Sequence, residues 1–237
     1  GVFMKRMILF TVLLTLFFLP ATIGACLSPS DNLTVIQGPN NLKIKAAVIV
    51  PQGEGPFPAI IMAHGRLGFS GPFPLSSYTK VAKSFAADGF LVVVVEYDAS
   101  DNSVLAGKSQ KQIQNAIDVV MAQPLVKKDK IGLWGMSNGA ATVLRTAAEN
   151  DSLFAVAAIV PPTQRAIGTD KKIRVPLLLI GGDYDTGCPV STIKQFEKSM
   201  LAQGRTVESF YGPYGHSHEY YAMTKRTIGF FQKYAAQ

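Results

Sequence analysis

Short apolar segments that favour β-strands alternate with segments of helical period along the chain after residue 30. The helical segments repeat apolar residues at i, i+3, i+4 and i+7, the pattern of a helix with one buried stripe. Strands are expected at residues 42–50, 59–64, 91–95, 130–134, 154–160, 175–180 and 206–211, and helices around residues 78–85, 113–120, 140–147, 193–201 and 223–234. Parallel strands need crossover connections, which these helices supply. The sequence therefore predicts an α/β fold with a mostly parallel central sheet and helices on both faces.

Length and composition limit the class of protein. A chain of 237 residues can bury a sizeable core and suits one α/β domain better than two. With 48% hydrophobic and 16% charged residues, the composition is not that of a disordered chain. The net charge of +7 is scattered, and its densest run (Lys127, Lys128 and Lys130) is expected in a solvated turn before a strand. We therefore expect no nucleic-acid partner.

The first residues have the layout of a secretory signal peptide. A short basic start at residues 4–6 precedes an apolar run at residues 8–19 and small residues up to Cys26. We expect residues 1–25 to be a signal peptide, residues 26–40 a linker with a first strand, and residues 41–237 the α/β domain. The apolar run is shorter than the about 20 residues of a spanning helix, although an uncleaved anchor stays an alternative.

The residues around Cys26 resemble a bacterial lipobox, in which cleavage leaves a lipidated cysteine at the new N-terminus. We therefore expect export, either as a membrane-attached form held by lipid on Cys26 or by the uncleaved segment, or as a free periplasmic or secreted form. The other cysteine, Cys188, is then either free or paired with Cys26.

Residues 135–139 read GMSNG, which is a G-x-S-x-G pattern with Ser137 at its centre. The pattern alone is weak, since about one chain in ten of this length contains it by chance. Its position is more specific, because an expected strand ends just before it and an expected helix begins just after it. A strand that turns at once into a helix strains the serine and leaves no room for neighbouring side chains, which explains both glycines. Ser137 is therefore the expected nucleophile.

A serine hydroxyl needs a base and an orienting carboxylate to become a good nucleophile. His216 and His218 follow the last expected strand, and Asp183 and Asp185 follow the strand at residues 175–180. His64 precedes the serine, and the chain order of serine, acid and histidine excludes it as the base. A metal site on the two late histidines lacks further ligands at a recognisable spacing. We expect neither a metal nor a cofactor.

Over roughly residues 40–235 the chain resembles the α/β-hydrolase superfamily, and within it the dienelactone-hydrolase-like serine hydrolases. The resemblance rests on the segments AHGRLG, GMSNG, GGDYDTGCP and YGPYGHSH. It implies Asp185 as the acid, three residues after a strand-end glycine, and His216 as the base, in a Gly-His pair; Asp183 and His218 are the alternatives. Dienelactone hydrolase itself uses a cysteine where this chain has Ser137, so the resemblance implies hydrolysis of esters in general.

Acyl transfer places negative charge on an oxygen, which needs two fixed hydrogen-bond donors. The backbone N–H of Asn138, at the start of a helix, is the first expected donor. The family's His-Gly-x pattern implies the N–H of Arg66 as the second, with Leu67 as the alternative and His64 in a structural role. Residues 161–174 are too few for a lid domain, so we expect an open site.

These features predict an exported serine hydrolase that cleaves small carboxylic esters through an acyl-enzyme. A thioesterase, a short-peptide hydrolase and a polyester hydrolase use the same machinery and stay alternatives. From another class, a surface binding module could keep this fold without catalysis.

Overall fold

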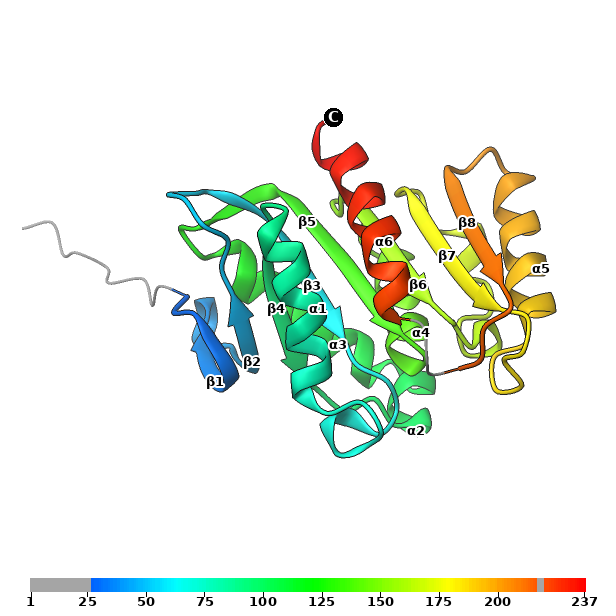
Figure 1. Cartoon of the computed structure of the whole chain (residues 1–237), viewed down its shortest axis with the longest axis horizontal. Helices are drawn as coiled ribbons and strands as arrows, with labels where there is room; N and C mark the ends of the chain where they lie inside the picture. Colours follow the sequence, from blue (N-terminus) through cyan, green and yellow to red (C-terminus); the bar gives the residue numbers. More distant parts are fainter. Residues whose placement is uncertain (1–26, 217–219) are drawn as a thin grey trace, which may run out of the picture.

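The computed structural model describes residues 27–216 and 220–237 (Figure 1). In these residues, eight strands form one sheet in the order β1-β2-β4-β3-β5-β6-β7-β8. The strands are β1 (Ser30–Gln37), β2 (Lys43–Ile49), β3 (Phe57–Ala63), β4 (Leu91–Glu96), β5 (Val126–Met136), β6 (Ala155–Ile159), β7 (Leu177–Gly182) and β8 (Val207–Gly212). The pairs β1–β2 and β2–β4 are antiparallel, and the remaining neighbours are parallel. The expected mostly parallel α/β sheet is confirmed.

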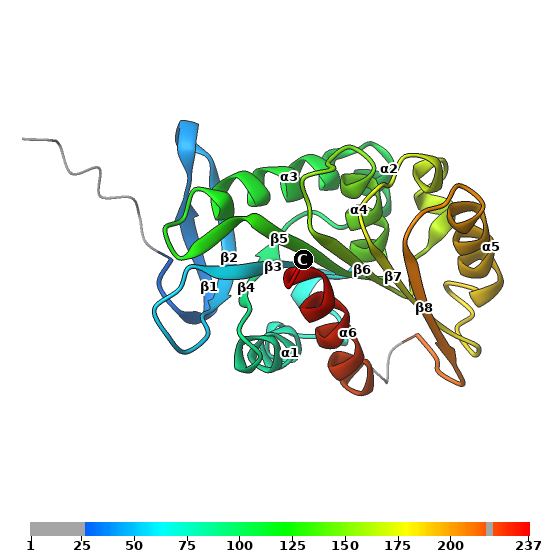
Figure 2. The same cartoon turned by 90° about the horizontal axis from the view of Figure 1, so that it is seen from above.

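Helices cover both faces of the sheet (Figure 2). Helices α1 (Leu75–Ala87) and α6 (Tyr220–Ala235) lie on one face, and α3 (Lys108–Met121), α4 (Asn138–Ala147) and α5 (Val190–Leu201) lie on the other, with the short α2 (Asp101–Leu105). Buried side chains of each strand alternate between the two layers: Val92 and Val94 pack on one face, and Leu91, Val93 and Val95 on the other. Strands buried on both faces read as continuous apolar runs, as β4 does.

The short 3₁₀ turns fall in connections: Pro39–Asn41, Gly68–Ser70, Thr163–Arg165 and Thr169–Lys171. The last two belong to the stretch at residues 161–174 that was expected to be too short for a lid. In the described part of the chain, no helix is both long enough and apolar enough to cross a membrane. The expected signal peptide and Cys26 lie outside the described residues, and their assignments stay predictions from the sequence.

One local expectation is wrong. Strand β5 begins at Val126, so Lys127, Lys128 and Lys130 lie inside the strand and not in a turn before it. The register between β3 and β5 shifts between Phe57 and Ala59, which makes this first half of β5 an irregular extension. Lys127 and Lys128 are exposed there, and Lys130 is partly exposed, so the cluster remains solvated as expected.

The connection between β5 and α4 is a tight turn centred on Ser137. The backbone of Ser137 has φ of +54° and ψ of −123°, a strained combination for a residue with a side chain. A Cβ at Gly135 would lie 2.3 Å from the carbonyl oxygen of Gly139, and a Cβ at Gly139 would lie 2.2 Å from that of Ala63. Both glycines are therefore required by close backbone approach, and the first turn of α4 packs directly on the end of β3.

Replacing Gly139 with alanine should destabilise the protein, because the added methyl group overlaps the backbone at the end of β3. Overpacking of this kind costs about 1 to 3 kcal/mol of unfolding free energy, measurable by urea denaturation. Gly229→Ala is the matched control, since a Cβ at this helical position meets nothing within 4 Å beyond its chain neighbours and its own helix backbone. The control should keep or gain stability, by up to about 1 kcal/mol. Equal stability of the two variants would contradict the packing argument.

Candidate active site

The parallel strands bring the expected functional residues to one edge of the sheet. Ser137 follows β5, Asp185 follows β7 and His216 follows β8, so all three lie beyond the carboxyl ends of their strands. The loop that begins at His64 follows β3, the direct neighbour of β5. In open parallel sheets this edge is where ligands bind.

A continuous hydrogen-bond chain joins the three side chains. His216 Nε2 lies 3.0 Å from Ser137 Oγ, and His216 Nδ1 lies 2.7 Å from Asp185 Oδ2. The carboxylate can only accept from Nδ1, which leaves Nε2 free to accept the serine proton when the ring is neutral. The Asp185 side chain is fully buried, whereas 39% of the His216 side chain is exposed. The imidazole is thus anchored from the buried side and accessible from the solvent side.

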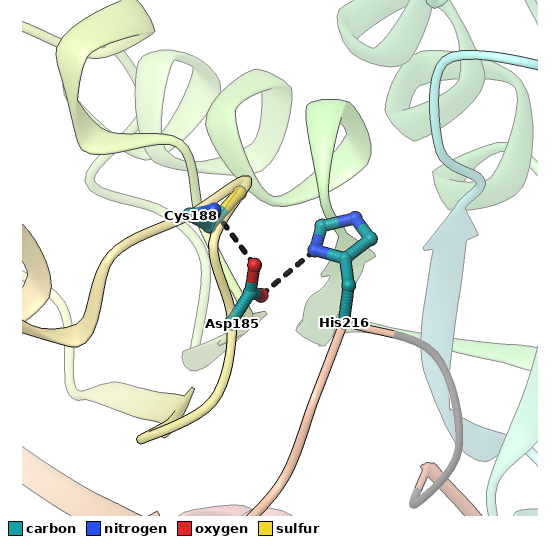
Figure 3. A group of neighbouring side chains, drawn as sticks. All are labelled: Asp185, Cys188 and His216. Atoms are coloured by element: carbon teal, nitrogen blue, oxygen red, sulfur yellow. Dashed lines mark hydrogen bonds and ion pairs between the residues drawn. The ribbon is translucent and has the colours of Figure 1, made fainter.

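The second carboxylate oxygen of Asp185 is also held. Its Oδ1 accepts hydrogen bonds of 2.8 Å from the backbone N–H groups of Gly187 and Cys188, and Figure 3 shows the bond from Cys188. With His216 Nδ1, the carboxylate has three hydrogen-bond donors. They hold it in place and supply the partners that a buried polar group needs. The alternative acid, Asp183, is exposed, and its backbone N–H donates to Gly212 at the end of β8. The alternative base, His218, lies outside the described residues.

Cys188 is a buried free thiol next to this carboxylate (Figure 3). Burial, together with the negative charge of Asp185, raises the pKa of the Cys188 thiol to about 12, so the thiol stays protonated and unreactive. Ligand-type atoms of Asp185, Cys188 and His216 lie within 4.8 Å of one another. The carboxylate and the imidazole are bonded to each other, an arrangement suited to proton transfer.

The two expected oxyanion donors come from the residue directly after Ser137 and from the loop after β3. The hydrogen bonds of the described residues engage the N–H of Ser137, which donates to Ile159 O at 2.9 Å, and that of Gly65, which donates to Tyr78 Oη at 3.2 Å. None of them involves the N–H of Arg66 or Asn138. The loop after β3 lies close, since a Cβ at Gly65 would be 3.5 Å from Ser137 Cβ.

A small open pocket of about 160 Å³ adjoins Ser137 and His216. Its other lining residues are Gly65, Arg66, Leu67, Gly68, Gly71, Pro72, Phe73, Tyr78 and Met136. Most of these surfaces are apolar and come from the loop after β3. A cavity near 150 Å³ holds a benzene-sized molecule, so the pocket suits a compact apolar group next to Ser137.

His64 holds the base of that loop. Its Nδ1 donates to Gly65 O at 2.9 Å, and its Nε2 accepts from the N–H of Tyr97 at 3.4 Å. The ring also packs against Phe69 and Tyr97. Burial lowers the pKa of His64 below its usual 6.5, so the ring stays neutral and keeps both partners.

Two residues that the motif analysis missed complete the surroundings of Ser137. Asp101, at the start of α2, and Arg165, after β6, both bind the side chain of Asn138. Neither belongs to a local motif. The sequence signal that could have found them is their position: each follows a strand whose carboxyl end lies at the same sheet edge as Ser137.

His64→Asn should flatten the pH dependence of stability below pH 6.5. The unfolded histidine binds a proton below its pKa of 6.5, but the folded one does not until the pH reaches its lowered pKa. The free energy of unfolding therefore decreases as the pH falls through this window, by at most about 1.4 kcal/mol per pH unit for one group. Urea unfolding across the window would show the slope. Parallel slopes for the variant and the wild type would exclude His64 as the cause.

Several known proteins are similar to this chain in sequence or in fold. The chain is 32% identical over 143 residues to the quorum-quenching protein AidA of Acinetobacter baumannii, covering 57% of this chain and 45% of AidA. It is 31% identical over 110 residues to acyl-coenzyme A thioesterase 6 of Mus musculus, covering 45% of this chain and 24% of that protein. The chain thus spans less than half the length of these relatives.

The fold is that of Est1E from Butyrivibrio proteoclasticus, with a TM-score of 0.70 at 19% identity over 87% of this chain and all of Est1E. The model of the dienelactone hydrolase family matches residues 44–230, which is most of the chain and includes Ser137, Asp185 and His216. The chain therefore belongs to the dienelactone hydrolase family.

Proposed function

We propose that this protein is a serine hydrolase that cleaves carboxylic esters through an acyl-enzyme intermediate. The observation that carries the proposal is the hydrogen-bonded chain from Ser137 through His216 to Asp185, built on a strained turn beside an open pocket. Nucleophile, base and orienting acid are recognised by this geometry. Membership of a hydrolase family supports the same reaction class.

In the proposed cycle, Ser137 Oγ attacks the ester carbonyl while its proton moves to His216 Nε2. Asp185 stabilises the resulting imidazolium through Nδ1. The negative oxygen of the tetrahedral intermediate accepts hydrogen bonds from the N–H groups of Asn138 and Arg66. His216 then returns the proton to the departing alcohol oxygen as the C–O bond breaks.

Water completes the cycle. It attacks the acyl-enzyme while Nε2 takes one of its protons, and the second tetrahedral intermediate collapses to release the carboxylic acid. Nε2 returns the proton to Ser137 Oγ, which restores the starting state. The balance is one ester and one water consumed, and one acid and one alcohol formed, so the proposed reaction needs no cofactor.

Thioester hydrolysis is the second candidate, and the similarity to acyl-coenzyme A thioesterases supports it. The same nucleophile and oxyanion donors serve both reactions, because only the leaving atom differs. A binding module without catalysis would have no need for a strained serine hydrogen-bonded to a histidine that a buried carboxylate holds in turn. The expected export rests on residues 4–26 and stays a prediction from the sequence.

Ser137→Ala should abolish both nitrophenyl-ester hydrolysis and labelling by a fluorophosphonate probe, while leaving the thermal stability unchanged. The reason is that the alanine keeps the backbone but removes the attacking oxygen. Losses of a triad member reach about 10⁴- to 10⁶-fold in kcat. Ser152→Ala is the matched control, since Ser152 is exposed on a turn before β6. Full activity in the Ser137 variant, or probe adducts on another residue, would exclude the mechanism.

Asp185→Asn should lower kcat by about 10⁴-fold, because an amide in place of the buried carboxylate favours the wrong imidazole tautomer. Asp183→Asn, two residues earlier and exposed, is the matched control and should keep wild-type kcat. Steady-state kinetics with nitrophenyl acetate would separate the two. A comparable loss in both variants would mean that the buried pair with His216 is not what orients the base.

A further inference from the structure

The side chain of Asn138, the residue directly after the nucleophile, has every hydrogen-bonding group engaged. Its Nδ2 donates to Ala99 O at 2.8 Å and to Asp101 Oδ1 at 2.7 Å, and its Oδ1 accepts from Arg165 Nη1 at 3.2 Å. Asn138 is 1% exposed. A buried amide with all partners in place holds one orientation, so the first residue of α4 is fastened to the loops after β4 and β6.

Asp101 connects three of the segments around Ser137. One of its carboxylate oxygens accepts from Asn138, and the other lies 3.0 Å from Arg165 Nη2 and 3.7 Å from Arg66 Nη1. The Arg165 and Asp101 side chains are 27% and 34% exposed, whereas that of Arg66 is 59% exposed. Solvent therefore weakens the contact with Arg66 most, and the bonds to Asn138 and Arg165 hold Asp101 most firmly.

The residues that Asp101 contacts include Asn138 and Arg66, whose backbone N–H groups are the two expected oxyanion donors. Asn138 and Arg66 supply the donors from different segments, one at the start of α4 and one in the loop after β3. The hydrogen bonds of the described residues include none between the backbones of these two residues. Asp101 accepts a hydrogen bond from the Asn138 side chain and forms a longer, more exposed ion pair with that of Arg66. Oxyanion stabilisation depends on donors held at fixed positions before the reaction starts.

We propose that Asp101, supported by Arg165, is a positioning residue that holds the two oxyanion donors in register with Ser137. The proposal rests on the proposed serine hydrolase function and adds two residues to its machinery. Asp101 acts through Asn138 and Arg66, without a required contact to the substrate.

The charges make the support of Arg165 necessary. An isolated carboxylate near the site would oppose the negative oxygen of the transition state, and the arginines offset it. Removing Arg165 alone leaves Asn138 Oδ1 without this donor. It also leaves the negative charge of Asp101 without the positive charge that offsets it. Removing the charge of Asp101 as well eliminates that repulsion. The two substitutions should therefore be strongly non-additive.

The experiment compares Asp101→Ala, Asp101→Asn, Arg165→Met and the Asp101→Asn/Arg165→Met double variant with the wild type. Asp151→Asn is the matched control, since it removes an exposed carboxylate 3.6 Å from Arg174 Nε. The readouts are kcat and KM for nitrophenyl acetate, the inhibition constant of a trifluoromethyl ketone, and the melting temperature. The ketone adduct with serine carries an anionic oxygen, so its affinity reports on the oxyanion donors.

Asp101→Ala should lower kcat by about 10- to 100-fold with little change in KM, below the full loss of a donor. The inhibition constant should rise by a similar factor. Asp101→Asn keeps an acceptor for Asn138 and should recover part of the rate. The double variant should lose no more than Arg165→Met alone, and Asp151→Asn should match the wild type. If Asp101→Ala does not fold, Asp101→Asn and Arg165→Met carry the same comparison.

Three results would overturn the proposal, and they are distinguishable. A wild type that neither hydrolyses esters nor reacts with the fluorophosphonate probe would remove the proposed function and this inference with it. An active wild type whose Asp101 and Arg165 variants keep kcat and ketone affinity would overturn the positioning role alone. A loss that follows the melting temperature and leaves ketone affinity unchanged would assign Asp101 to stability only.

Discussion

The approach of α4 to the end of β3 is the constraint on which the site depends. Glycine at residues 135 and 139 lets two backbones meet where side chains would overlap by more than an ångström. Ser137 lies between these glycines with a strained backbone, and its Cβ lies close to the loop that begins at His64. Because β3 and β5 are direct neighbours, one packing contact sets the positions of Ser137 and of the loop with Arg66.

The partners of Ser137 depend on the other end of the sheet. Strands β7 and β8 pair as far as Gly182 and Gly212, and backbone hydrogen bonds continue beyond them, from Asp183 to Gly212 and from Tyr184 to Tyr214. Gly182 allows this, since a Cβ there would lie 2.3 Å from Tyr214 O. The loops that carry Asp185 and His216 are thus bonded together, and the acid and base reach the serine as a unit.

Buried polar groups around the serine have their partners inside the protein. Both oxygens of Asp185, both ring nitrogens of His64 and the amide of Asn138 are engaged. Such groups do not reorganise when charge develops in the reaction. The backbone strain at Ser137 persists because this surrounding network and the glycine packing leave no alternative conformation. Stability and preorganisation therefore come from the same contacts.

Local patterns were enough to predict most elements and the turn at Ser137. Apolar periodicity indicates which face of a helix or strand is buried, and glycine spacing indicates where two backbones approach closely. The predicted start of β5 was wrong, because residues 126–130 extend the strand only through an irregular pairing with β3. The residues alone left Asp183 and Asp185 open, and packing decided which carboxylate faces His216. Asp101 and Arg165 stand 64 positions apart, and no local pattern marks a pair that far apart in the chain. The sequence by itself determined the elements and the turn at Ser137, because both are short-range. The tertiary structure decided which carboxylate bonds to His216 and what supports Asn138, because these depend on loops that meet only when the sheet is assembled.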